Sequence, residues 1–208
     1  MDNLRRFFKN PCPKNSLNYK TIIIVTYGRS GSTLLQGIIN TIKGVLVRGE
    51  NSAFCRGLYE AWRSLIIAKT CHANKINIKR PTCAWFGADQ LNPDRFLHQC
   101  QTLIREQLIA DHPSNVTCYG FKEIRYLNHL DDLPHYLDFL CQVMPECAVV
   151  FNMRSHDDVQ TSMLRTIKND LQEQNDSTQE KLLLADLQRA DDIFRDYSSS
   201  HPNCYINY

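Results

Sequence analysis

Short apolar runs alternate along the chain with longer stretches of helical periodicity. The runs are too short for helices, and they lack the apolar–polar alternation of half-exposed strands, which is typical of strands buried on both faces of a parallel sheet. The pattern predicts an α/β fold in three layers (α/β/α), with helices around a central, mainly parallel sheet of about five strands. The five runs are Thr21–Thr26, Val45–Val47, Tyr119–Lys122, Ala148–Phe151 and Tyr205–Asn207.

Helical patterns fill the intervals between these runs. Asn92 followed by Pro93 is a strong helix start, because asparagine caps a helix and proline suits its first position. The stretch 69–91, with Pro81 and several polar residues, predicts an irregular loop or lid inside a single domain that covers residues 1–208. Helices are expected at 34–42, 54–68, 92–109, 133–144, 155–167 and 177–197.

Composition narrows the function classes. A formal charge of +2 creates no strong overall field, so nucleic acid is not an expected partner and any anion must be bound by locally placed groups. The basic opening "MDNLRRFFKN" lacks a following apolar segment, and no run reaches the length of a membrane span; we therefore expect a cytoplasmic protein. Nine cysteines without a C-x-x-C pair, and histidines without metal-ligand spacing, predict reduced thiols and no metal site.

The stretch "TYGRSGST" follows the first apolar run and opens the first helix. In a parallel α/β unit, a helix start beyond a strand end presents backbone N–H groups and the positive end of the helix dipole to an anion. Two glycines lack the Cβ atoms that would keep an anion away, three hydroxyl side chains add donors, and an arginine adds positive charge. The candidate anion-binding residues are Gly28, Arg29, Ser30, Gly31, Ser32 and Thr33.

A nucleotide P-loop kinase is one alternative for this stretch. Such a loop requires G-x-x-x-x-G-K-[ST], whereas here Ser32 follows Gly31 and Thr26 occupies the place of the first glycine. A kinase also needs a carboxylate for Mg²⁺ at a neighbouring strand end. The run Ala148–Phe151 instead leads to a cation, Arg154, which argues against a kinase.

Two motifs together resemble a known family. "TYGRSGSTLL" resembles the 5′-phosphosulfate loop of sulfotransferases that use 3′-phosphoadenosine 5′-phosphosulfate (PAPS). "FNMRSHDDVQTSM" resembles their 3′-phosphate motif, with Arg154 and then Ser162. The stretches "RGENSAF", "WFGADQLNPDRF" and "GFKEIRYL" are similar to bacterial members of the carbohydrate-type or uncharacterised sulfotransferases. The resemblance spans Lys20–Ser162 and implies a P-loop-like fold that transfers a sulfuryl group from PAPS, without a metal, to a hydroxyl or amine of a small molecule or carbohydrate.

The resemblance also implies roles for individual residues. Arg29 matches the place where many family members carry lysine, and it is the candidate cation for the leaving group. Glu50 matches the catalytic glutamate of some carbohydrate sulfotransferases, and its alternative is a surface glutamate paired with an arginine, Arg48 or Arg56. Lys122 is the candidate contact for sulfate or acceptor. Glu123 is a second candidate base, or a partner of a neighbouring cation.

Three further expectations complete this reading. The chain stops at "CYINY", where family members continue into a segment that closes over the nucleotide, so a non-catalytic PAPS-binding domain is the other alternative. Four aromatic residues could line an acceptor pocket, namely Tyr59, Trp62, Trp85 and Phe86, although aromatic residues at such positions more often belong to the core. Trp85 and Phe86 are the better candidates. The acidic pairs at 131–132 and 191–192 are expected on solvated surfaces. The identity of the acceptor and the oligomeric state stay open.

Overall fold

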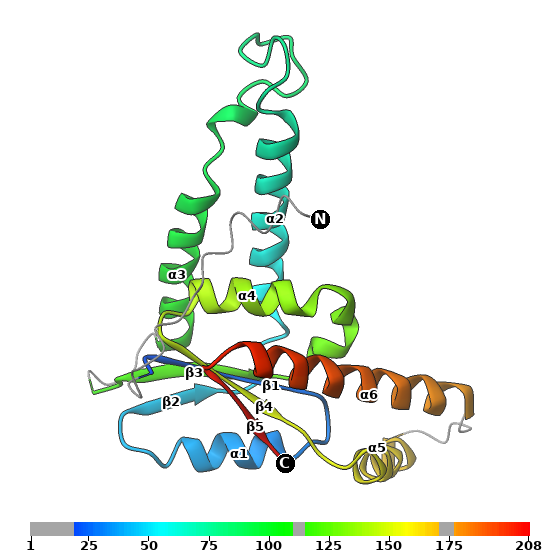
Figure 1. The fold of residues 1–208 in the computed structure, drawn as a ribbon. Helices are drawn as coiled ribbons and strands as arrows, with labels where there is room; N and C mark the ends of the chain where they lie inside the picture. Colours follow the sequence, from blue (N-terminus) through cyan, green and yellow to red (C-terminus); the bar gives the residue numbers. More distant parts are fainter. Residues whose placement is uncertain (1–18, 110–114, 171–176) are drawn as a thin grey trace.

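A five-stranded parallel sheet forms the centre of the protein (Figure 1). In this computed structural model, residues 19–109, 115–170 and 177–208 are described, so the basic opening of the chain lies outside the described residues. The strand order is β2-β3-β1-β4-β5, and every neighbouring pair is parallel, which confirms the predicted fold class. The strands are β1 (Thr21–Thr26), β2 (Val45–Arg48), β3 (Cys118–Glu123), β4 (Cys147–Asn152) and β5 (Cys204–Asn207).

The central strand, β1, is buried on both faces. Ile23, Ile24 and Val25 are fully buried, as the run of apolar residues without alternation predicts. On the β3 side, Gly120 allows the close approach of the two strands: a Cβ atom there would lie 1.6 Å from the carbonyl oxygen of Ile22. The tight, parallel pairing brings the carboxyl ends of β1, β3 and β4 to the same edge of the sheet.

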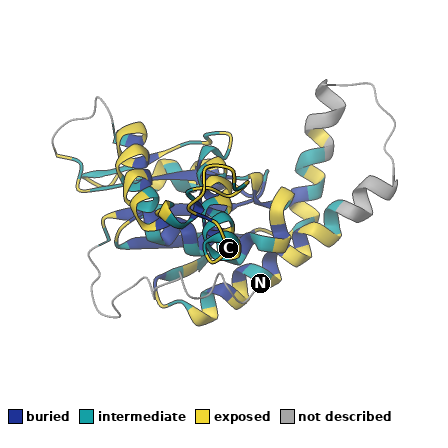
Figure 2. Cartoon of the chain, turned by 90° about the horizontal axis from the view of Figure 1, so that it is seen from above, coloured by how far each residue is buried: buried dark blue, intermediate teal, exposed yellow. Residues whose placement is uncertain are grey.

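Helices complete the three layers. Figure 1 shows α1 against one face of the sheet and α4 and α6 against the other, with α5 next to α6. Figure 2 shows that buried residues gather on the sheet and on the inner sides of the helices. No helix in the described ranges combines the length and the apolar character that crossing a bilayer requires. The helices are α1 (Ser32–Ile39), α2 (Phe54–His72), α3 (Pro93–Ile109), α4 (Leu133–Val143), α5 (His156–Asp170) and α6 (Ser177–Ser200), with the 3₁₀ helices η1 (Ala88–Gln90) and η2 (Arg125–Asp132).

Helices α2 and α3 project from the sheet as a two-helix arm (Figure 1). The side chain of Asn92 accepts a 2.9 Å hydrogen bond from the backbone N–H of Arg95, so the predicted cap of α3 is confirmed. The prediction that 69–91 is irregular throughout is wrong at both ends, because α2 continues to His72 and η1 lies within the segment. Helix α2 continues because neither proline nor glycine interrupts residues 58–72.

The 3₁₀ helix η2 was not predicted, and it changes the reading of the first acidic pair. Asp131 is exposed as expected, but Asp132 forms 2.9 Å ion pairs with both Arg56 and Arg63 of α2. The expectation of a solvated surface is therefore wrong for Asp132. Its partners lie about two helical turns apart on one face of α2, so a single carboxylate joins η2 to the base of the arm.

Candidate active site

Most of the predicted site residues meet in a cavity at the carboxyl edge of the sheet. The chain leaves β1 toward β2 and leaves the neighbouring β4 toward β5, so the loops after these strands diverge and leave a crevice between them. The cavity has a volume of about 370 Å³. It is lined by Gly28, Arg29, Gly31, Ser32, Thr33, Glu50, Lys122, Ile124, Arg154 and Ser162.

The loop between β1 and α1 presents a helix start to this cavity. Gly31 has a φ of 80°, a left-handed conformation that suits glycine, and its carbonyl oxygen accepts the N–H of Leu34 at 2.9 Å. The N–H groups of Ser32 and Thr33, at the first two positions of α1, come before this bond, have no partner within the helix and are available to an anion. Arg29 also has a positive φ, 64°, which is uncommon for a residue with a side chain and must be held by its contacts.

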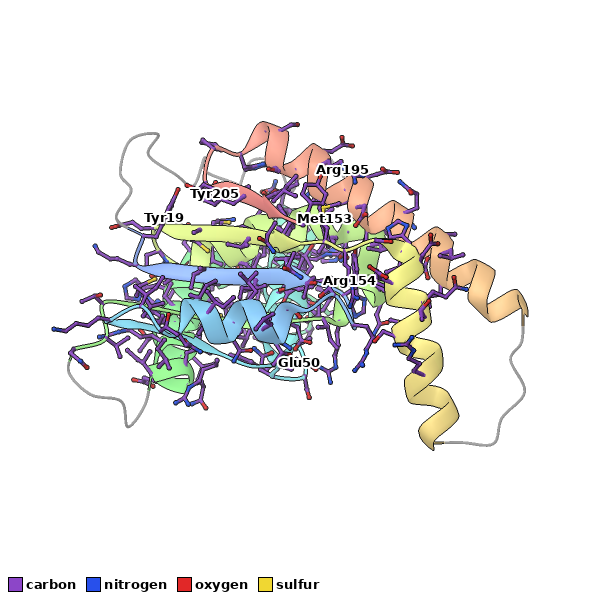
Figure 3. The ribbon with its side chains drawn as sticks, turned by 90° about the horizontal axis from the view of Figure 1, so that it is seen from below. Tyr19, Glu50, Met153, Arg154, Arg195 and Tyr205 are labelled. Carbon is purple, nitrogen blue, oxygen red and sulfur yellow. The ribbon has the colours of Figure 1, made fainter. Side chains whose placement is uncertain are left out.

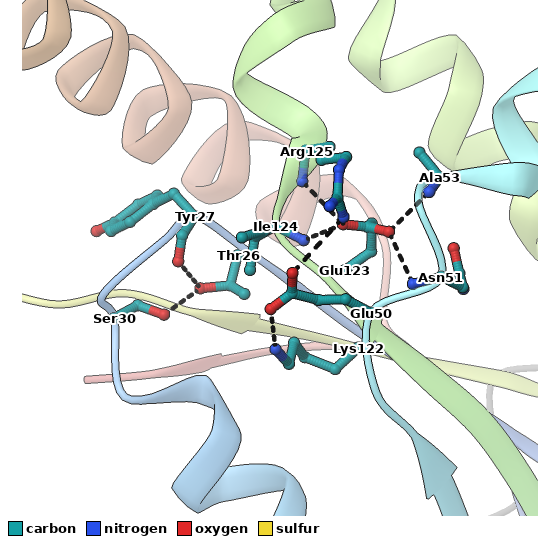
Figure 4. A network of polar contacts seen from close by, with 10 residues as sticks. All are labelled: Thr26, Tyr27, Ser30, Glu50, Asn51, Ala53, Lys122, Glu123, Ile124 and Arg125. Carbon is teal, nitrogen blue, oxygen red and sulfur yellow. Dashed lines mark hydrogen bonds and ion pairs between the residues drawn. The ribbon is translucent and has the colours of Figure 1, made fainter. Parts of the chain in front are cut away.

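Buried polar contacts to β4 hold this loop in place. The hydroxyl groups of Thr26 and Ser30 lie 2.6 Å apart (Figure 4). Thr26 also donates to the carbonyl oxygen of Asn152. The side-chain amide of Asn152 donates to the carbonyl oxygen of Ser30 at 3.0 Å. Ser30 is buried and its side chain does not line the cavity, so the structure gives this predicted anion-binding hydroxyl a role in shaping the loop.

The two predicted motifs are in direct contact. Arg29 donates from Nε to the hydroxyl of Ser162 at 2.8 Å, and Arg154 donates to the carbonyl oxygen of Arg29 at 3.1 Å. Arg154, which precedes α5, also lies 3.6 Å from the carboxylate of Asp158 in the first turn of that helix. These bonds join residues more than 120 positions apart in sequence, and they place two guanidinium groups at one end of the cavity.

Glu50 lies at the same edge of the sheet as Arg154 (Figure 3). It forms a 2.6 Å ion pair with Lys122, whose side chain is almost completely buried, and lies 3.6 Å from Arg125. Glu50 is thus not a surface glutamate paired with Arg48 or Arg56, the alternative considered from the sequence. The ion pair fixes both side chains at the cavity wall, with the carboxylate partly exposed.

Glu123 serves as a structural anchor beside the site (Figure 4). It is 2% exposed, does not line the cavity, and accepts backbone N–H groups from Asn51, Ala53 and Ile124 as well as the guanidinium of Arg125. Burial alone would raise its pKa, but the hydrogen bonds from these donors outweigh burial and lower the pKa. Glu123 therefore holds in place the loop that carries Glu50.

A second buried network, which was not predicted, lies behind the site. The hydroxyl of Tyr27 donates to Asp191 at 3.1 Å and accepts the backbone N–H of Arg154 at 3.1 Å, while His156 lies 2.9 Å from the same carboxylate. Burial, together with the Asp191 carboxylate, raises the pKa of Tyr27 to about 12. The expectation that Asp191 is solvated is wrong, and its position three residues before the buried Phe194 was the available signal.

The predicted aromatic pair of an acceptor pocket lies elsewhere. Trp85 stacks on His72, and Figure 1 places their segment at the far end of the arm, away from the sheet. Neither Trp85 nor Phe86 lines the cavity, and both are exposed. Tyr59 and Trp62 are fully buried at the base of the arm and do not line the cavity, so they belong to the core.

A comparison of the chain with known protein families identifies the family to which these site residues belong. A protein-family model described as "Sulfotransferase family" matches residues 21–206, a span that runs from β1 into β5 and includes every residue of the cavity. No curated protein matches the chain at a significant level. Because the family match extends over most of the chain, the protein belongs to the sulfotransferase family.

Proposed function

We propose that this sulfotransferase takes its sulfuryl group from PAPS and transfers it to a hydroxyl or amine of a small-molecule or carbohydrate acceptor. Membership of the family supports sulfuryl transfer in general. The observation that carries the choice of donor is the contact between Arg29 and the pair Arg154 and Ser162 beside the start of α1. PAPS has two anionic ends, a 5′-phosphosulfate and a 3′-phosphate, and the two motifs supply separate groups for them.

The residues of the cavity fit such a donor. Three cations, Arg29, Lys122 and Arg154, face one carboxylate, that of Glu50, so the described lining is positively charged. A Cβ atom built on Gly31 would meet nothing within 4 Å, which leaves open space over the helix start. We assign the start of α1, with Arg29 and Lys122, to the phosphosulfate, and Arg154 with Ser162 to the 3′-phosphate.

Each side chain then has a distinct task. Bound PAPS supplies the sulfuryl group, which leaves the 5′-phosphate and joins the acceptor oxygen or nitrogen. Arg29 stabilises the negative charge that develops on the leaving phosphate, and its fixed charge means that it does not donate a proton. Lys122 binds sulfuryl oxygens from the cavity wall, and Glu50 accepts the proton of the acceptor. Glu123 keeps the loop around Glu50 in position.

Nucleotide binding tests the choice of donor. Calorimetric titration should show tighter binding of adenosine 3′,5′-bisphosphate than of ADP or ATP without Mg²⁺. Arg154→Ala should weaken binding of the bisphosphate by about tenfold or more, because a charge-assisted hydrogen bond is lost. Arg189→Ala, which removes an exposed arginine paired with Asp131, is the matched control and should bind normally. Preference for Mg·ATP would contradict the proposal and favour a kinase.

Turnover is tested separately from binding. Transfer of labelled sulfate from PAPS to a panel of glycans, phenols and amines should identify an acceptor. Binding of the bisphosphate without transfer to any member of a broad panel would favour the non-catalytic alternative.

A further inference from the structure

A second cavity shares Glu50 with the proposed donor site. Its volume is about 600 Å³, within the range of pockets that hold small molecules. A carboxylate that borders both cavities is in position to take a proton from a ligand in one while the sulfuryl donor occupies the other. The second cavity is lined by Arg48, Gly49, Glu50, Asn51, Phe54, Leu103, Gln107 and Leu108.

Among the residues that the structure describes, the positive and negative charges that line this cavity do not cancel. Its charged lining residues are Glu50 and Arg48. Glu50 is already neutralised by its ion pair with Lys122. Arg48 donates from Nε to the carbonyl oxygen of Leu108 at 3.1 Å, a neutral acceptor that orients the guanidinium without cancelling its charge. The described part of the wall therefore favours a ligand with a negative group.

The rest of the lining is mainly apolar, with two polar side chains, those of Asn51 and Gln107. Phe54, Leu103 and Leu108 supply apolar surface, and 41% of the surface of Leu103 is exposed to solvent. The side-chain amide of Asn51 is buried, and neither its nitrogen nor its oxygen has a hydrogen-bond partner among the described residues. A buried amide without partners is costly, and a ligand hydroxyl, which both donates and accepts, would satisfy it.

We propose that this cavity binds the acceptor and that the acceptor is an alcohol with an apolar body and an anionic group. The inference rests on the proposed function, since it takes Glu50 as the base. Arg48 binds the anionic group, the apolar wall formed by Phe54, Leu103 and Leu108 contacts the body, and Asn51 hydrogen-bonds to hydroxyl groups near Glu50. Glycosides of uronic acids have this chemistry.

A matched pair of probes tests the anionic preference. p-Nitrophenyl β-D-glucuronide and p-nitrophenyl β-D-glucoside share the aryl ring and differ in a carboxylate against a hydroxymethyl group. Calorimetric titration, with saturating adenosine 3′,5′-bisphosphate and again without nucleotide, should show binding of the glucuronide at least about tenfold tighter than that of the glucoside. Equal affinity, preference for the glucoside, or no binding of either probe would overturn the inference.

Variants assign the preference to this cavity. Arg48→Gln should abolish the preference for the glucuronide, and Arg48→Lys should retain part of this preference. Arg105 is an exposed arginine of α3 outside the lining, so Arg105→Gln should leave the preference unchanged. Leu103→Glu places a carboxylate on the same wall and should weaken the glucuronide selectively, which keeps the test valid if the Arg48 variants are unstable. An unchanged preference in both Arg48→Gln and Leu103→Glu would refute the site. Normal bisphosphate binding and sulfate transfer without any preference would defeat this inference alone.

Discussion

Replacing Glu123 with glutamine is expected to destabilise the protein although the two side chains have nearly the same shape. One carboxylate oxygen of Glu123 accepts the N–H groups of Ile124 and Arg125 and the guanidinium of Arg125, at 2.8 to 3.2 Å. The other oxygen accepts the N–H groups of Asn51 and Ala53, at 3.2 and 2.8 Å. All five bonds require an acceptor, and the NH₂ group of glutamine is a donor.

The expected magnitude follows from these bonds. In its better orientation, the glutamine turns its NH₂ group toward Asn51 and Ala53, the side with fewer donors. Two hydrogen bonds to a charged acceptor are then lost, at about 1.5–3 kcal/mol each, so the free energy of unfolding should fall by about 3–6 kcal/mol. That is a large part of the roughly 5–15 kcal/mol that stabilises a typical domain.

Urea unfolding followed by circular dichroism at pH 7 measures this loss. Glu146→Gln is the control, because Glu146 forms an exposed ion pair with Lys20, for which a loss of about 0–1 kcal/mol is expected. The pKa of Glu123 is lowered in the folded state, so its contribution is complete above the ordinary value of 4.5 and is lost as the pH falls through the lower folded value. The difference between wild type and Glu123→Gln should therefore shrink below pH 4.5.

Two results would refute this reasoning. A loss below about 1 kcal/mol at pH 7 would mean that the anchoring bonds contribute no more than a surface ion pair. A difference that widens as the pH falls would mean that the carboxylate is not stabilised in its charged form.

Three further predictions concern the site. Tyr27→Phe removes the hydroxyl that bonds to Asp191 and to the backbone of Arg154. The free energy of unfolding should fall by about 1–3 kcal/mol, and calorimetry should show a weaker affinity for adenosine 3′,5′-bisphosphate. Unchanged values would show that the network does not position Arg154. Gly31→Ala should lower the free energy of unfolding by about 1–2 kcal/mol, because the φ of Gly31 is 80°. Gly37→Ala, inside the exposed part of α1, should raise the free energy of unfolding by about 0.5–1 kcal/mol. Effects of the same sign in thermal unfolding would contradict the backbone argument. Glu50→Gln should reduce the rate of labelled-sulfate transfer by about 10²–10⁴-fold, and undiminished transfer would exclude Glu50 as the base.

Local patterns were sufficient for the elements and for the anion-binding loop. The strands were recognisable because residues of β1 such as Ile23 and Ile24 are buried on both faces, which leaves an apolar run without alternation. The glycine–serine turn and the pair Arg154 and Ser162 were recognisable because each is a local arrangement tied to a strand end. The end of α2 and the helix η2 were missed, since weak local propensities leave such boundaries to packing.

The sequence by itself therefore determined the parallel α/β fold, the family and the two motifs that meet in the cavity. Only the tertiary structure separated Glu50, at the cavity wall, from Glu123, a buried anchor, and only it placed Asp191 inside the protein. The reason is that a charged side chain takes its role from its partners, and these are distant in sequence: Glu123 contacts Asn51 across 72 positions and Asp191 contacts Tyr27 across 164. Periodicity describes a single segment, whereas burial and hydrogen bonding depend on which segments the fold brings together.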